Sequence, residues 1–232
     1  VLSSAAVIGK VLLQAYRFKY FIRKFIGHDV SSLSATISAR LGSEFVSQTT
    51  PSYIGGEIVR IAWLTRRGVP AGRAAWITTI EIISDVFVGT ILGIISGVFA
   101  VLNGGYLIGT IVILLSIPTI TFWFLLMFFS AKRNLKLPDL IERMIQKILR
   151  GERGRKLVTS TNSAIADLCQ MSRENFNFSS SAVIKTFAIG IAITVIAFVL
   201  QGISFMVLVN AVGNGIPSIS LFDSVMATSA ST

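Results

Sequence analysis

The stretch "AAWITTIEIISDVFVGTILGIISGVFAVLNGGYLIGTIVILLSIPTITFWFLLMFFSA", residues 74 to 131, contains neither Lys nor Arg. It is too long for one membrane span, because about 20 apolar residues suffice to cross the hydrocarbon core. The "NGG" sequence at 103–105 divides it and predicts one span at about 76–101 and a second at about 106–130. Pro118 lies in the second span, and membrane helices tolerate proline where neighbouring groups satisfy the freed carbonyl.

The composition of the whole chain agrees with a membrane protein. Of its 232 residues 53% are hydrophobic and 14% charged, and the mean hydropathy is +0.74, whereas soluble domains carry about 25% charged residues. A third span is predicted at about 182–210, and residues 1–16 and the segment from Ile219 have the character of incomplete spans. The sequence therefore predicts an all-α, polytopic transmembrane helix bundle, a single domain over residues 1–232 that is truncated at both ends.

The basic residues predict how the chain is oriented. The net charge is +10, and Lys and Arg gather in three short segments, Arg17–Lys24, Arg60–Arg73 and Lys132–Lys156. By the positive-inside rule these segments face the cytoplasm, and the uncharged connections at 102–105 and 211–217 face outside. A multi-pass protein of the cell membrane explains this pattern better than a nucleic-acid partner does.

Cysteine and histidine are too few for a metal or disulfide framework. The chain has one cysteine, Cys169, and one histidine, His28. One cysteine excludes an internal disulfide, and the pair offers no His/Cys zinc set. We therefore predict neither a cofactor nor a metal.

Residues 132–180 are predicted to be a cytoplasmic helical insertion. Within "LPDLIERMIQKILR", residues 137 to 150, the apolar Ile141, Met144, Ile145 and Ile148 share one helix face. Such an amphipathic helix either caps the bundle or lies in the headgroup layer. A second helix is predicted at about 155–175.

Residues 25–59 must begin and end on the same side of the membrane, yet they are too short and too polar for two spans. Either this segment lies on the cytoplasmic surface, or it enters the membrane and returns as a re-entrant hairpin that turns near Pro51. We favour the hairpin. Non-helical backbone at membrane depth requires burial in protein or a wet cavity.

Glycines are expected to shape this hairpin and its surroundings. Gly55 and Gly56 permit backbone conformations closed to other residues, which predicts a tight bend at the hairpin tip. Gly89, Gly93 and Gly97 recur every four residues, a spacing that lets membrane helices approach closely. We expect the tip to turn against this glycine face.

Four charged residues near these glycines have both a structural and a functional interpretation. Glu81 and Asp85 share one face of their helix. They form ion pairs with a buried arginine, Arg40 or Arg60, or they bind substrate or protons. Glu57 and Arg60, three apart, either stabilise a helix start or place an arginine near a lipid phosphate.

The stretch "TPSYIGGEIVRIAWLTRRGVPAGRAAWITTIEIISD", residues 50 to 85, resembles the lysylphosphatidylglycerol synthase transmembrane family, also called the flippase-like family. The shared features are a T-P-x-x-x-G-G-E motif, an R-x-G-V loop and a helix with E-x-x-x-D. Two departures are Ile82, where members commonly have Arg, and the missing P-x-P-G-G-x-G-x-x-E segment, expected beyond Thr232. The resemblance implies two related halves and the translocation of lipids such as aminoacylated phosphatidylglycerol or a polyprenyl-linked lipid.

Taken with the resemblance, the residues predict a lipid translocase that moves a phospholipid between leaflets. Its polar path would be lined by Glu57, Arg60, Glu81, Asp85 and Arg40, and its tip shaped by Pro51, Gly55 and Gly56. The alternative is a membrane-embedded accessory component of a glycolipid or glycosyltransferase pathway. No catalytic constellation favours an enzyme. The expected partners are membrane lipids with anionic or aminoacylated headgroups, a second copy of the chain, or a lipid-modifying enzyme.

Overall fold

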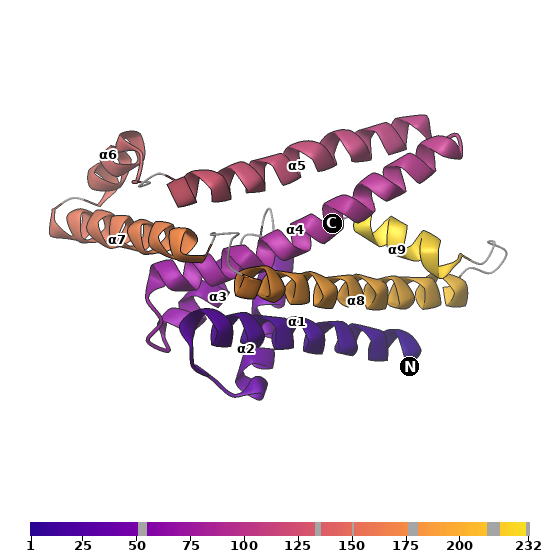
Figure 1. Cartoon of the computed structure of the whole chain (residues 1–232), viewed down its shortest axis with the longest axis horizontal. Helices are drawn as coiled ribbons and strands as arrows, with labels where there is room; N and C mark the ends of the chain where they lie inside the picture. Colours follow the sequence, from indigo (N-terminus) through magenta and orange to yellow (C-terminus); the bar gives the residue numbers. More distant parts are fainter. Residues whose placement is uncertain (51–54, 133–135, 150, 176–180, 213–218, 231–232) are drawn as a thin grey trace. The chain divides into compact units, whose positions relative to one another are not determined.

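The computed structural model describes residues 1–50, 55–132, 136–149, 151–175, 181–212 and 219–230, and these residues fold into α-helices without strands. The helices are α1 (Leu2–Ile26), α2 (Leu33–Thr49), α3 (Gly55–Thr65), α4 (Ala71–Leu102), α5 (Tyr106–Lys132), α6 (Asp139–Ile148), α7 (Glu152–Asn175), α8 (Ser181–Val212) and α9 (Leu221–Ala230) (Figure 1). The predicted all-α class is confirmed.

Three of the described helices are long and apolar enough to cross a membrane. They are α4, α5 over Tyr106–Leu125, and α8 over Val183–Val212. The spans predicted at 76–101, 106–130 and 182–210 thus coincide with helices of sufficient length and apolar composition, and α5 continues through Pro118. The incomplete spans predicted at residues 1–16 and from Ile219 fall in α1 and α9, which are not among these three.

The chain divides into two compact units. The first unit comprises Val1–Gly42, Glu81–Trp123 and Lys185–Thr232, and the second comprises Ser43–Ile80 and Phe124–Ile184. Helices α2, α4, α5 and α8 contribute residues to both units. Each unit is described by itself below.

In the first unit, α1 and α8 lie side by side (Figure 1). The hydroxyls of Ser3 and Ser204 are 2.8 Å apart, and a Cβ on Gly9 would lie 3.2 Å from Leu200. Helix α9 packs on α8, where Gly202 leaves room for Val225. Small residues therefore set the close approach of these helices, as is typical of membrane bundles.

Helices α4 and α5 form a hairpin in the same unit. Gly104 turns the chain with φ 88°, a conformation that L side chains rarely adopt. A Cβ on Gly97 would lie 2.8 Å from the carbonyl oxygen of Gly109, so the two backbones are in close contact. Gly93 faces Ser116, also on α5, and Gly89 is half-buried. Gly93 and Gly97 therefore face α5, and the packing role of the Gly89–Gly93–Gly97 face stays a prediction.

In the second unit, the end of α2 packs on the start of α3. A Cβ on Gly56 would lie 2.6 Å from the carbonyl oxygen of Ser43, and the Gly55 N–H donates to Thr50 Oγ1 at 3.1 Å. The predicted bend at Gly55–Gly56 is wrong, because both glycines lie in the first helical turn of α3. Their missing side chains make room for α2. The predicted turn of this segment against the glycine face of α4 stays a prediction. Pro51, the predicted tip, lies outside the described residues.

The rest of the second unit is built on α7. Trp76 Nε1, near the start of α4, donates to Ser172 Oγ at 3.0 Å, and both side chains are buried. Helix α6 packs on α7, and Asn162 Oδ1 of α7 accepts a hydrogen bond from Leu137 N at 2.9 Å. The helices predicted within residues 132–180 are confirmed, and the insertion's cytoplasmic location remains a prediction.

Candidate functional site: a buried ionic cluster in the first unit

The site is built on the two carboxylates of α4. Glu81 and Asp85 are four residues apart, so their side chains leave the same face of the helix. The Glu81 side chain is fully buried, whereas 33% of the Asp85 side chain is exposed. A buried carboxylate without a partner is costly in any apolar environment, and both have arginine partners.

Arg17 of α1 binds both carboxylates at once. Its Nη2 lies 3.2 Å from Glu81 Oε1 and 2.8 Å from Asp85 Oδ2, and its Nη1 lies 2.5 Å from Asp85 Oδ1. The two contacts with Asp85 are bidentate, the geometry that suits the planar guanidinium fork best. The Arg17 side chain is itself fully buried.

Two further helices complete the cluster. Arg40 of α2 is buried, and its Nη1 donates to Glu81 Oε1 at 3.1 Å. Thr194 of α8 accepts a hydrogen bond from Arg17 Nη1 and donates to the Gly190 carbonyl oxygen at 3.0 Å. The formal charges of Arg17, Arg40, Glu81 and Asp85 sum to zero. Helices α1, α2, α4 and α8 thus converge on one charge-balanced, largely buried cluster.

The packing of α1 on α8 explains why Arg17 reaches this position. Arg17 and Phe21 are one turn apart on α1, and Thr194 and Gly190 are one turn apart on α8. A Cβ on Gly190 would collide with the Phe21 ring, so glycine is needed there for the helices to approach. That approach brings Thr194 within hydrogen-bond distance of Arg17.

The structure therefore brings together three of the predicted site residues, Arg40, Glu81 and Asp85, and it shows the predicted ion pair between Arg40 and Glu81. Sequence reasoning missed Arg17 and Thr194. The sequence places Arg17 in the basic segment that ends at Lys24. Helical spacing distinguishes Arg17 from the other basic residues of this segment. Arg17 lies four residues before the buried Phe21 and shares its helix face, whereas Arg23 is exposed.

Glu57 and Arg60 form a pair in the second unit. Arg60 Nη2 donates to Glu57 Oε1 at 2.9 Å, with 27% of the Glu57 side chain and 5% of the Arg60 side chain exposed. Glu57 lies in the first turn of α3, where a negative charge complements the helix dipole. The predicted i, i+3 pair is confirmed, and its part in a substrate path remains a prediction.

The charged groups of the cluster are of kinds that can exchange one salt-bridge partner for another. Within the part of the chain that the structure describes, no three His, Cys, Asp or Glu side chains are grouped to hold a metal ion. Guanidinium groups can exchange a carboxylate partner for a phosphate, and carboxylates can exchange a guanidinium for an ammonium.

Three apolar helices of membrane-spanning length, together with a buried ionic cluster between helices, define an integral membrane protein with a polar interior. The model of one protein family, the lysylphosphatidylglycerol synthase transmembrane region, matches residues 1–232. The chain belongs to this family. Neither a curated protein nor a solved structure matches it significantly.

Proposed function

We propose that the protein moves a phospholipid between the leaflets of the cell membrane, and that the cluster of Arg17, Arg40, Glu81 and Asp85 lines the path of the headgroup. The proposal rests on one observation: the cluster is accessible from outside through one of its carboxylates, that of Asp85. Asp85 is one-third exposed while it holds the fully buried Arg17. A headgroup that approaches Asp85 therefore reaches a chain of exchangeable ion pairs.

Energetics favour a functional role for such a cluster. A charged side chain at the centre of a membrane helix costs about 2.5–3.5 kcal/mol even on insertion-based scales. Replacing a buried ion pair with apolar residues is often neutral or stabilising, so stability alone is a weak reason to keep four charges. The need to bind a polar substrate within the apolar layer would explain why the four charges are kept.

The chemistry of the cluster matches headgroups that carry both signs of charge. Arg17 and Arg40 can pair with a lipid phosphate, and Glu81 and Asp85 with an ammonium group. Aminoacylated phosphatidylglycerol carries a phosphate and at least one amino group, and the name of the family is consistent with such a lipid. A polyprenyl-linked lipid would engage the arginines through its phosphates.

The α2–α3 hairpin belongs to the same proposal. We infer that it is re-entrant from the cytoplasmic side and that its Glu57–Arg60 pair binds lipid headgroups. The close contact of Gly56 with the Ser43 backbone supports a compact hairpin. A second copy of the chain or a lipid-modifying enzyme could deliver lipid to it.

The test is transport by the full-length protein in vesicles that contain fluorescent phosphatidylglycerol or lysyl-phosphatidylglycerol. We expect Asp85→Asn to reduce flipping at least tenfold, because the amide cannot exchange partners as a charge does, while the protein stays folded. Asp29→Asn is the matched control, since Asp29 is 48% exposed and its contact with Lys19 is 3.8 Å long.

Equal flipping by the wild type and Asp85→Asn, with equal thermal stability, would contradict the proposal. Loss of flipping in proportion to a loss of folded protein would assign the cluster a structural role alone.

A further inference from the structure

The amphipathic helix α6 exposes its apolar face. None of its residues is buried. Leu140, Ile141, Met144 and Ile148 are 72%, 43%, 54% and 75% exposed, and they share one side of the helix. Although α6 packs on α7, its own unit leaves these four apolar side chains uncovered.

The polar face of α6 carries its basic residues beside the apolar face. Arg143 and Lys147 are one turn apart and both exposed. Lys147 lies next to Leu140 around the helix, a position from which its ammonium can reach outward while its stem covers apolar surface. Between Lys132 and Lys156 the sequence has nine Lys or Arg against three acidic residues, Asp139, Glu142 and Glu152.

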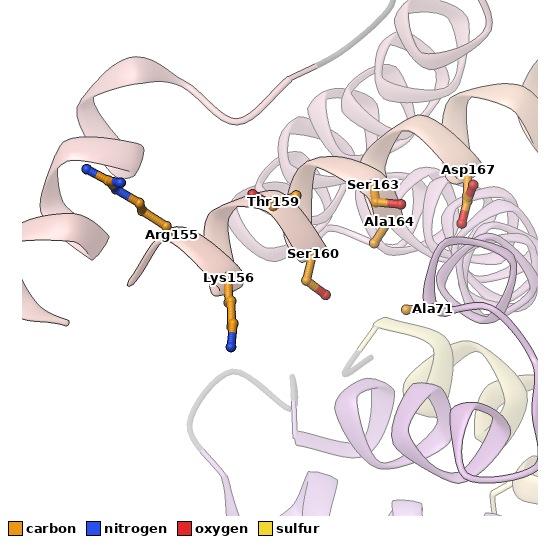
Figure 2. A pocket seen from close by; sticks show the side chains of 8 residues that line it. All are labelled: Ala71, Arg155, Lys156, Thr159, Ser160, Ser163, Ala164 and Asp167. Carbon is orange, nitrogen blue, oxygen red and sulfur yellow. The ribbon is translucent and has the colours of Figure 1, made fainter. Parts of the chain in front are cut away.

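The start of α7 extends the basic character. A pocket of about 530 Å3 runs along α7, with Arg155 and Lys156 at one end and Asp167 at the other (Figure 2). The hydroxyls of Thr159, Ser160 and Ser163 lie between them. Cationic and hydroxyl groups are the usual donors to phosphate oxygens.

The short connection between α5 and α6 limits which apolar surroundings the exposed face of α6 can reach. Helix α5 ends at Lys132 and α6 begins at Asp139, so six residues separate a membrane-spanning helix from the amphipathic one. At about 3.3–3.6 Å per residue, this linker keeps α6 within roughly 25 Å of the end of α5. The nearest extended apolar phase is therefore the membrane that α5 crosses.

From these observations we infer that α6 and the start of α7 form a surface that binds the anionic leaflet. The apolar face of α6 lies in the headgroup layer, and the basic side chains of α6 and α7 pair with lipid phosphates. The charge complementarity points to lipid as the occupant of this face. The inference does not depend on lipid translocation.

Site-directed fluorescence on the full-length protein tests this surface. An environment-sensitive dye is placed at Met144→Cys or, as the matched control on the polar face, at Gln146→Cys, both with Cys169→Ser. The vesicles are of phosphatidylcholine, with or without phosphatidylglycerol, and contain a lipid with a quencher near its headgroup. We expect several-fold stronger quenching at position 144 than at 146, further increased by phosphatidylglycerol.

A double variant tests the contribution of the basic side chains of α6 to the binding of anionic lipid. Arg143→Gln with Lys147→Gln should reduce the increase caused by phosphatidylglycerol and leave the contrast between positions 144 and 146. Three results would overturn the inference: equal weak quenching at both positions, no response to phosphatidylglycerol, or a buried dye at 144 that the lipid quencher does not reach. The last would show that protein covers α6.

Discussion

At the residue scale, Arg17 keeps the two carboxylates of α4 compensated. Arg17→Gln would leave Glu81 and Asp85 with one buried guanidinium fewer, and breaking a buried pair typically costs about 3–5 kcal/mol. We expect a clear drop in the unfolding temperature of the detergent-solubilised protein. Arg23→Gln is the control in the same helix, because Arg23 is exposed and should change stability by less than about 0.5 kcal/mol. Similar shifts in the two variants would show that Arg17 is not buried as described.

The site could be predicted from the sequence only in part, and the reason lies in single residues. Glu81 and Asp85 are recognisable because a charge within an apolar helix needs a partner, and Arg40 was among the candidates. Arg17 could not be predicted as a buried residue, because Lys19, Arg23 and Lys24 give the whole segment the composition of a cytoplasmic loop. Thr194 is hidden because hydroxyl residues in membrane helices usually bond to their own backbone, as Thr194 also does.

At the scale of elements, the contact between α2 and α3 predicts opposite effects of the same substitution at two glycines. Gly56→Ala should destabilise the protein by about 1–3 kcal/mol, because its Cβ would meet the Ser43 carbonyl, which is backbone and cannot turn aside. Gly42→Ala should be neutral or stabilising by up to about 1 kcal/mol, because a Cβ there would meet no atom within 4 Å beyond its chain neighbours and the backbone of its own helix, and alanine favours a helix. Thermal unfolding of the two variants measures the sign. Equal effects would refute the close contact.

Elements differ in how far the sequence reveals them. The spans α4, α5 and α8 follow from apolar length alone, because each must cross the hydrocarbon layer. The conformation of Gly55 and Gly56 could not be derived in this way. A glycine pair serves equally well for a bend or for close helix packing, and only the position of Ser43 shows that packing applies. The continuation of α1 to Ile26 was likewise concealed by its basic residues.

At the scale of the whole molecule, the distribution of basic residues predicts the sidedness of the chain. Only α4 separates Arg66 from Asn103, and both residues are exposed. Cysteines at these two positions, with Cys169→Ser, should react with a membrane-impermeant reagent from opposite sides, Asn103 from outside and Arg66 from inside. Labelling of both from the same side of sealed cells or vesicles would disprove the proposed orientation.

The ion pairs of Arg17 also constrain how the protein is made. Glu81 follows Arg17 by 64 residues and Thr194 by 177. The ribosome therefore delivers α1, with its guanidinium, long before α4 and α8 are synthesised. Until then Arg17 must remain hydrated, because a buried charge without its partners is costly. The close fit of Phe21 against Gly190 can form only after α8 has entered, so final docking of α1 is a late step of biogenesis.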